Sequence, residues 1–318
     1  MMRNKYLCFL ALLLTFTSSV ALAASDPKFL TIGTASSGGA YYPIGIAMAD
    51  IITNKLGIQT TAQITGGAIE NNSLIQNKGV DIAISQGVMS YNALNGLPPY
   101  KQKLTDVSGI FNGLSKGVFQ LVVNKNSSIK SIKDLKGKKI ALGPAGGGAI
   151  TTFLEVFTSY GFTDKDFQAV YISYEQAGDS LVDGNLDAIL VQAAIPSPAI
   201  TQQTASKKPL RFIAIEDDML VKLMKKYAYY SKITIPKEMY NTDSPVKTFY
   251  ISNMVVVNKN LGTDLVYRIT KAFFENLATI QNSHPSVKGL TLESAVEGLP
   301  IPLHAGAQKY FKEKGLLK

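Results

Sequence analysis

The sequence predicts an α/β protein made of two lobes with a similar plan, and two observations carry this prediction. Short apolar strands alternate with amphipathic helices along most of the chain, an order typical of parallel sheets covered by helices. In addition, the run at 80–86 (VDIAISQ) resembles the run at 186–192 (LDAILVQ), with glutamine five residues after aspartate in both. These glutamines follow the glycine loops by 47 residues from Gly39 and 44 from Gly148, which indicates an internal repeat of whole units.

The first unit opens with a strand at 29–32, a loop of small residues at 33–40 and a helix that starts near Pro43. Proline suits a first helical turn because the N–H that it lacks would have no partner there. The free N–H groups of such a helix start, beside glycines that let a ligand come close, can bind an anion. Next we expect a strand at 58–64, a helix over 68–77 closed by Gly79 in the left-handed conformation, and a strand at 80–86.

The second unit repeats this order after a strand that leaves the first unit. The glycine loop at 143–149 follows a strand and opens a helix that carries Phe153 and Phe157 on one face. The other strands are expected at 115–124, 140–142, 167–173, 186–192, 210–215 and 248–258. The other helices are expected at 177–183, at 219–230, after Asp264 as N-cap, and within 300–318.

The chain is expected to cross between the lobes twice, near residues 121 and 251. Lobe 1 would then hold residues 24–120 and 252–318, and lobe 2 residues 121–251. Two crossings make the lobes hinge about a cleft, and such a cleft is a preferred place for a small ligand.

Residues 1–23 are expected to be a secretory signal peptide. Arg3 and Lys5 precede an apolar run at 6–16, and Ala21 and Ala23 form a small-x-small cleavage site. The run is shorter than the roughly 20 residues of a membrane-spanning helix. We therefore expect cleavage near Ala23 and a soluble protein in the periplasm, without a disulfide because the sequence has a single cysteine, Cys8.

Composition argues against several kinds of site. The net charge is +9, but the lysines are dispersed, so nucleic acid is not an expected partner. Two scattered histidines give no metal-ligand spacing, and no phosphate or dinucleotide motif is present, so neither metal nor cofactor is expected. Beyond the signal peptide the arginines are Arg211 and Arg268, so bidentate recognition of a ligand carboxylate by arginine is nearly unavailable.

Five segments together resemble one family. They are GTASSGGAYYPIG (33–45), TGGAIEN (65–71), DLKGKKIALGPAGGG (134–148), ITIPKEMY (233–240) and PLHAGAQKYFKEKG (302–315). With them the chain resembles the TAXI-type solute receptors of tripartite ATP-independent periplasmic (TRAP) transporters. The resemblance implies the type II periplasmic binding protein fold and a receptor that passes a small carboxylate, such as an acidic amino acid or a dicarboxylate, to a membrane permease. The chain departs from the family at 146–149, which lacks hydroxyls, and at 192–196 (QAAIP), where the usual glycine before the proline is replaced.

The candidate ligand site combines the loops of both units. Backbone and hydroxyl donors of the first loop would hold a carboxylate, the tyrosines would form a wall, and amide side chains would bind polar groups from both lobes. The candidate residues are Ser36, Ser37, Gly38, Gly39, Ala40, Tyr41, Tyr42, Gly67, Asn71, Gln86, Gly147, Gly148, Ala149 and Gln192. One of the two tyrosines is expected to pack against the sheet instead, and Asp81 and Asp187 are expected to serve as structural caps.

Two alternatives remain at this stage. A periplasmic protein that presents its ligand-bound form to a membrane sensor would use the same fold. A serine hydrolase is a remote alternative, because Gly113, Ser115 and Gly117 match the G-x-S-x-G pattern and His284 or His304 could serve as base. A nucleophile elbow needs a helix after the serine, whereas Ser115 precedes a strand. We therefore expect a monomeric, non-catalytic binding protein.

Overall fold

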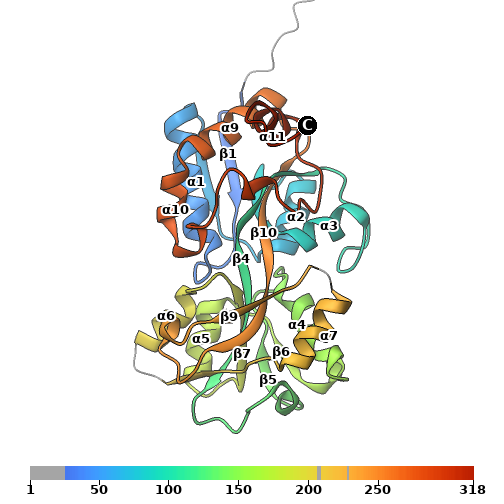
Figure 1. Cartoon of the computed structure of the whole chain (residues 1–318), viewed down its shortest axis with the longest axis vertical. Coiled ribbons are helices and arrows are strands. Elements are labelled where there is room, and N and C mark those ends of the chain that lie inside the picture. Colours follow the sequence, from blue (N-terminus) through green and yellow to red (C-terminus); the bar gives the residue numbers. More distant parts are fainter. Residues whose placement is uncertain (1–25, 206–208, 228) are drawn as a thin grey trace, which may run out of the picture.

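The computed structural model describes residues 26–205, 209–227 and 229–318 and shows two α/β lobes that share one sheet (Figure 1). The strand order is β2-β1-β3-β10-β4-β7-β5-β6, with β8 beside β4 and β9 beside β10. The expected signal peptide, residues 1–23, lies outside the described residues. Among the described residues, no helix is long and apolar enough to cross a membrane.

The upper lobe in Figure 1 contains strands from the N-terminal part of the chain and helices from its C-terminal part. Its strands β1 (Phe29–Gly33), β2 (Gln59–Gln63) and β3 (Ile82–Gln86) are parallel. Its helices are α1 (Tyr41–Leu56), α2 (Ala68–Gln76), α3 (Gly87–Asn95), α9 (Thr263–Glu275), α10 (Leu277–Ser283) and α11 (Ala305–Glu313). Apolar faces of α1, α9 and α11 pack together around Phe111, Phe273 and Phe311, which are fully buried.

The lower lobe repeats the plan with parallel strands β5 (Lys139–Ala141), β6 (Gln168–Val170) and β7 (Ala188–Ala193). Its other strands and its helices are β8 (Leu210–Phe212), β9 (Ser231–Ile235), α4 (Ala149–Ser159), α5 (Tyr174–Val182), α6 (Pro198–Ala205), α7 (Asp217–Lys226) and α8 (Lys237–Tyr240). Short 3₁₀ turns cover Ile132–Leu135, Asp164–Asp166, Pro285–Val287 and Ser294–Val296. The lobe has its own core, in which Phe119 and Phe249 stack with ring centroids 5.0 Å apart.

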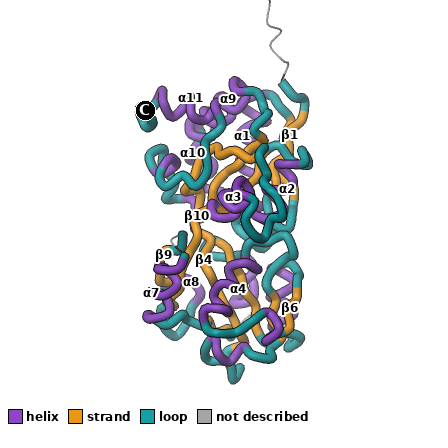
Figure 2. The backbone as a smooth tube through the Cα atoms, turned by 90° about the vertical axis from the view of Figure 1, so that its right-hand side faces the viewer, coloured by secondary structure: helices purple, strands orange, loops and turns teal. Residues whose placement is uncertain are grey.

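Two long antiparallel strands, β4 (Val107–Asn124) and β10 (Val246–Asn258), run through both lobes (Figure 2). β10 pairs with β3 in the upper lobe and with β9 in the lower lobe. β4 pairs with β7 and β8 of the lower lobe. The crossing points expected near residues 121 and 251 fall inside these strands, and the exact lobe boundaries stay a prediction.

Two of the residues expected to cap helices differ from the structure. Lys78, with φ 59°, takes the left-handed position after α2 that was expected for Gly79. A Cβ at Gly79 would lie 2.8 Å from Cδ2 of Leu74, so that a larger residue would shift this side chain. Asp264 is not the N-cap of α9, since Gly262 holds that position. Asp264 lies in the first turn and accepts a hydrogen bond from Nε of Arg268 at 2.7 Å.

The starts of one strand and one helix also differ from the expected positions, because of small or polar residues. β4 begins at Val107, eight residues before the expected strand, in a stretch where Gly109, Asn112 and Gly113 weaken the strand pattern. Helix α5 begins at Tyr174 rather than at residue 177, because Ser173 caps it. The Ser173 hydroxyl accepts from the Gln176 N–H, and the Gln176 side chain accepts from the Ser173 N–H.

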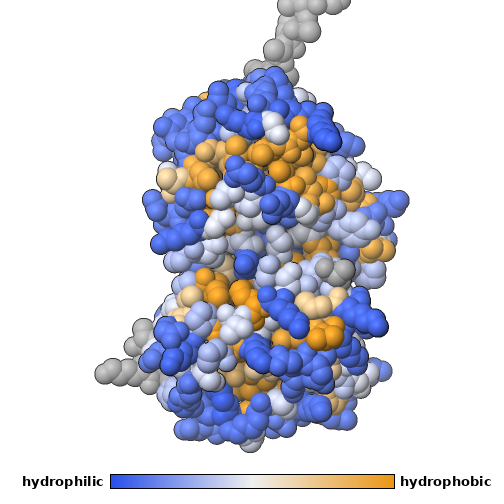
Figure 3. Space-filling model, viewed as in Figure 1, coloured by the Kyte–Doolittle hydropathy of each residue, from blue (hydrophilic) through white to orange (hydrophobic). Residues whose placement is uncertain are grey.

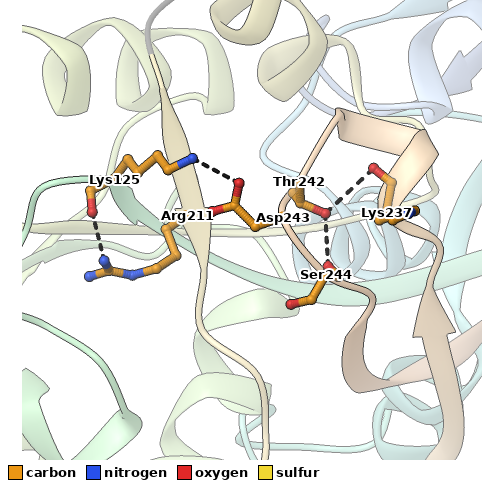
Figure 4. A network of polar contacts seen from close by, with 6 residues as sticks. All are labelled: Lys125, Arg211, Lys237, Thr242, Asp243 and Ser244. Atoms are coloured by element: carbon orange, nitrogen blue, oxygen red, sulfur yellow. Dashed lines mark hydrogen bonds and ion pairs between the residues drawn. The ribbon is translucent and has the colours of Figure 1, made fainter.

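Arg211 has a structural role at the base of the lower lobe (Figure 4). Its guanidinium donates to the carbonyls of Lys125 and Ser127 at 2.6 and 2.7 Å, and the Lys125 ammonium pairs with Asp243 at 2.9 Å. The neighbouring Thr242 hydroxyl reaches the carbonyl of Ser244 at 2.9 Å. Arg268 likewise pairs with carboxylates on the upper lobe. Both arginines are thus committed to side-chain and backbone partners outside the inter-lobe cavity.

The outer surface is mainly hydrophilic at both ends of the molecule, with hydrophobic areas over the middle of the upper lobe and over the part of the lower lobe nearest to it (Figure 3). Large hydrophobic side chains that are exposed in the described chain are scattered over both lobes, as Ile46 and Tyr171 show. Scattered exposure of this kind is ordinary for a globular protein.

Candidate ligand-binding site

A cavity of about 40 Å³ lies between the lobes and is walled mainly by small residues. The upper lobe contributes Ala35, Ser36, Gly39, Ala40, Tyr41, Gly66, Gly67, Ala68 and Gln86. The lower lobe contributes Pro144, Gly147, Gly148, Ala149, Tyr174, Gln192 and Ala193. None of these lining residues has a charged side chain, and glycines and alanines leave the backbone accessible.

Five helices begin at this cavity. The first residues of α1, α2, α4 and α5, namely Tyr41, Ala68, Ala149 and Tyr174, line it. Gln86, which also lines it, directly precedes the first residue of α3. Helix N-termini carry the positive end of the helix dipole. In α2 the Ile69 and Glu70 N–H groups already donate to the Gly146 carbonyl, and in α5 the Tyr174 N–H donates to the Ser36 hydroxyl. The helix dipoles favour a negatively charged group at the cavity, whereas the carboxylates of Glu70 and Glu175, which accept from the lining Gly66 N–H and Ser36 hydroxyl, oppose it.

Gln86 and Gln192 are the polar side chains at the cavity that keep free hydrogen-bonding capacity. Their exposed fractions are 4% and 6%. Oε1 of Gln86 and both amide atoms of Gln192 have no hydrogen-bond partner among the described atoms. A buried polar atom without a partner costs about 1–3 kcal/mol, so such atoms usually have a function. Both side chains are available to a ligand.

The internal repeat explains how the two glutamines reach the same place. Asp81 Oδ2 accepts from the Thr31 N–H at 2.9 Å, and Asp187 Oδ2 accepts from the Lys139 N–H at 2.8 Å. Each aspartate thus links the strand that follows it to the neighbouring parallel strand. This is a structural role, as was expected for both residues. Burial raises the pKa of Asp81 more than the Thr31 N–H lowers it. The glutamine then follows near the carboxyl end of β3 and of β7, where ligands bind in open α/β sheets.

The two candidate tyrosines lie differently. Tyr41 lines the cavity, and its hydroxyl donates to Oδ1 of Asn253 on β10 at 2.7 Å. Burial raises the pKa of Tyr41 well above its ordinary value, so the phenol stays protonated. Tyr42 is half-buried and does not line the cavity.

Asn71 does not line the cavity either, because its side chain is fully used inside the upper lobe. Its Nδ2 donates to the carbonyls of Thr34 and Ile84 at 2.6 and 2.7 Å. Its Oδ1 accepts from the Thr65 hydroxyl at 2.7 Å. Asn71 therefore fixes the two upper-lobe loops relative to β3.

The first loop is divided between the cavity and the contact between the lobes. Ser36, Gly39 and Ala40 line the cavity, whereas Ser37 and Gly38 do not. The Ser36 and Ser37 hydroxyls both donate to the carboxylate of Glu175 on α5. Ten of the fourteen candidate residues therefore line the cavity, the exceptions being Ser37, Gly38, Tyr42 and Asn71.

Tyr174 is the polar lining residue that the sequence did not single out. Its hydroxyl lies 3.3 Å from both the backbone N and the backbone O of Gln192, so it positions the strand end that carries that glutamine. A Cβ at Gly143 would lie 2.7 Å from the Tyr174 ring, which leaves room for glycine alone. The capping pattern after residue 172 marks a helix start and could have pointed to Tyr174. Ala35, Gly66, Ala68, Pro144 and Ala193 were also missed.

The lobes are closed on the cavity. The Gly146 carbonyl of the lower lobe accepts from the N–H groups of Ile69 and Glu70 in the first turn of α2, at 3.0 and 3.1 Å. A Cβ on Gly66 would lie 2.9 Å from Cα of Gly146, so glycine permits this approach. Loops from both lobes thus meet directly above the cavity.

In a comparison with known protein families, the NMT1-like family matches residues 32–315 of this chain. The chain belongs to the NMT1-like family. This NMT1-like chain also has the fold of type II periplasmic binding proteins, as three solved structures show.

The first of these structures is PhnD1 from Prochlorococcus marinus in complex with methylphosphonate, with 13% identity, TM-score 0.55, and 92% of this chain and 100% of that chain covered. The second is described as a periplasmic transporter, with 16% identity, TM-score 0.53 and coverage of 91% and 93%. The third is an ancestral arginine-binding protein bound to arginine, with 17% identity, TM-score 0.50 and coverage of 83% and 99%. At these identities the likeness concerns the fold.

A curated relative from Haemophilus influenzae, named for thiamine biosynthesis, is 32% identical over 114 residues. The match covers 35% of the NMT1-like chain and about a third, 32%, of that relative.

The G-x-S-x-G pattern of the NMT1-like chain lies in a continuous strand and not in a strand-turn-helix elbow. Ser115 Oγ accepts from Nδ2 of Asn253 at 3.0 Å. The histidines serve elsewhere, since His284 Nδ1 accepts from the Ser286 N–H at 3.2 Å and His304 Nδ1 accepts from the Gly306 N–H at 3.1 Å. The described residues include no group of three or more side chains able to hold a metal ion.

Proposed function

We propose that this chain is a periplasmic solute receptor that encloses a small anion, expected to be a carboxylate, between its lobes. The observation that carries the proposal is the convergence of five helix starts and two unpartnered buried glutamines on one cavity lined by no charged side chain. Helix starts supply positive potential, and the glutamine amides supply donors and acceptors that fix orientation.

The proposed mechanism is closure of two lobes about the solute. Because Gln86 belongs to the upper lobe and Gln192 to the lower lobe, a solute that binds both has more contacts in the closed state than in the open one. A ligand shifts such an equilibrium only by its difference in affinity for the two states. Tyr41 and Tyr174 would complete the wall, and the Gly148 and Ala149 amides would face the anion, since the Gly147 N–H donates to the Pro144 carbonyl at 2.9 Å.

The resemblance to TAXI-type receptors favours acidic amino acids or dicarboxylates as solutes and the permease of a TRAP transporter as partner. Family membership and fold are equally compatible with the permease of an ATP-driven importer. The expected signal peptide, with cleavage near Ala23, would place the receptor in the periplasm, and we propose that it acts as a monomer.

A thermal-shift screen of the mature protein tests the proposal. The panel contains carboxylates, amino acids, phosphonates, sugars and nucleotides. A solute at a hundredfold excess over its dissociation constant adds about 2.7 kcal/mol to the free energy of unfolding and raises the midpoint accordingly. We expect the largest shift from a small carboxylate. If uncharged sugars alone gave a shift, or no compound did, the anion-receptor proposal would be abandoned.

Replacing Gln192 by Leu identifies the site. The variant should lose the shift yet unfold at the same or a higher midpoint, because it removes buried amide atoms that have no protein partner. Gln120→Leu is the matched control on the neighbouring strand β4. Gln120 is equally buried, but it accepts from Tyr240 at 2.7 Å and donates to the Ala193 carbonyl at 3.1 Å. This control should lose about 1–3 kcal/mol of stability. A Gln192→Leu protein that binds as before would remove Gln192 from the site.

A further inference from the structure

Glu175 joins the two lobes through both of its carboxylate oxygens. It lies in the first turn of α5 in the lower lobe. Oε2 accepts from the Ser36 hydroxyl at 2.5 Å, and Oε1 accepts from the Ser37 hydroxyl of the same upper-lobe loop. Hydrogen bonds to an ionised group are roughly twice as strong as those between neutral groups.

The surrounding contact is closely packed. A Cβ on Gly38 would lie 2.8 Å from Cδ of Glu175 and 3.0 Å from Cβ of Ala199, so the loop can approach α5 and α6 only with glycine at this position. The Gly38 carbonyl accepts from the Ala199 N–H and from the Ser197 hydroxyl, both at 3.1 Å. Six polar groups across the lobe boundary are therefore satisfied by one another.

Glu175 is not among the residues that line the cavity, whereas Ser36 is. The carboxylate therefore lies at the edge of the closed cleft, outside the space that a solute would take. Burial raises the pKa of Glu175, but the hydrogen bonds from Ser36 and Ser37 and from neighbouring groups lower it further, so the carboxylate is ionised at neutral pH.

We propose that Glu175 is a latch that holds the two lobes closed through Ser36 and Ser37, independently of any solute. This inference rests on the proposed function in one respect, namely that closure encloses the solute. A latch made of protein groups raises the population of the closed state before the solute binds. Entry and release of the solute then require the latch to open. It also gives the serine loop a partner that the sequence could not reveal, since the loop was expected to hold the solute carboxylate.

Three backbone N–H groups report lobe closure directly. Ile69 and Glu70 donate to the Gly146 carbonyl, and Ala199 donates to the Gly38 carbonyl, each across the lobe boundary. Their exchange with deuterated water should therefore require the lobes to separate. The test is to measure this exchange by NMR in the mature protein without added solute. Glu175→Gln should accelerate it at these three amides by about tenfold or more, because the charged acceptor is lost.

The Asp81 amide, which donates to the Thr31 carbonyl inside the upper lobe, is the internal reference. Glu238→Gln is the matched control, because Glu238 is exposed on the same lobe and the change removes one negative charge equally. Neither the Asp81 amide in Glu175→Gln nor the three reporters in Glu238→Gln should change. Acceleration at Asp81 equal to that at the reporters would indicate general destabilisation and overturn the latch.

Ser37→Ala removes the other end of the contact without changing a cavity residue. It should accelerate the same three amides, and the double variant with Glu175→Gln should be no faster than Glu175→Gln alone, because the hydrogen bond from Ser37 is one of the two that Glu175→Gln already weakens. If Glu175→Gln does not fold, Ser37→Ala decides alone. Unchanged reporter exchange in Ser37→Ala would overturn the latch. Because no solute is used, this outcome is independent of the solute screen.

Discussion

Gly148 lies so close to Gln86 that a side chain at residue 148 would displace this glutamine. A Cβ on Gly148 would be 2.2 Å from Oε1 of Gln86. The backbone of Gly148, with φ −65° and ψ −15°, is one that any residue adopts, so Gly148→Ala introduces no strain of its own. We expect the affinity for the solute found in the screen to fall by about tenfold, the effect of roughly 1.4 kcal/mol.

Stability should change little in Gly148→Ala, since the displaced group is the end of a flexible side chain. Isothermal titration calorimetry and urea unfolding measure the two quantities. Gly289→Ala is the control, because a Cβ there meets nothing within 4 Å. Equal affinity in both variants and the wild type would mean that Gln86 does not contact the solute.

The repeat in the sequence was enough to find Gln86 and Gln192, because a matching strand in each unit places its glutamine at the same sheet edge. It could not separate Ser36 from Ser37. That distinction depends on which serine faces the cavity, and both serines bind Glu175, which is 139 residues from Ser36 in sequence and reaches the loop only after both lobes have folded. Tyr174 was missed for the same reason, since its contact with the Gln192 backbone is tertiary.

At the scale of elements, His304 makes the start of helix α11 sensitive to pH. Nδ1 accepts from the Gly306 N–H, and Nε2 lies 3.1 and 3.0 Å from the carbonyls of Lys259 and Leu261. Burial lowers the pKa of His304 from the ordinary 6.5, although the two carbonyls oppose this shift. The folded protein therefore favours the neutral ring, whereas the unfolded chain takes up a proton near pH 6.5.

Because the unfolded state binds more protons, the free energy of unfolding should fall as pH decreases below about 6.5. Urea unfolding at pH 7.5 and 5.5 measures this loss. His304→Asn keeps a good N-cap acceptor without a titrating ring and should show a smaller loss between the two pH values. His284 contributes equally in both proteins. The same pH dependence in His304→Asn would refute the assignment.

The elements themselves were largely predictable, since apolar periodicity fixes which residues face a core. Some errors came from glycines that make room for neighbouring atoms, whereas the start of α5 was misplaced because Ser173 caps it. Gly79 looked like a helix terminator, yet it makes room for Leu74. The first part of β4 was missed because its glycines weaken the strand pattern, and one of them, Gly113, has φ 69°.

At the scale of the whole molecule, β4 and β10 have an irregularity in the upper lobe, next to the place where they pass into the lower lobe. Asn253 pairs with Ser115, but Val255 pairs with Phe111, so β4 has extra residues at this place. Gly113 lies in this bulge with φ 69°. Bulges bend strands, and a bulge beside the crossing is a suitable place for the bending that opening and closing require.

Gly113→Ala should therefore affect both stability and closure. An alanine in the left-handed region costs about 1–2 kcal/mol, and its Cβ would also lie 2.9 Å from the Ser294 carbonyl oxygen, so the backbone must shift. Gly137→Ala is the control with the same conformational strain, because φ is 75° there but no atom lies within 4 Å. Both variants should lose stability in urea unfolding. Only Gly113→Ala should accelerate exchange at the Ile69 and Ala199 amides, because only that strain lies where the crossing strands bend. Equal exchange in the two variants would place the hinge elsewhere along β4 and β10.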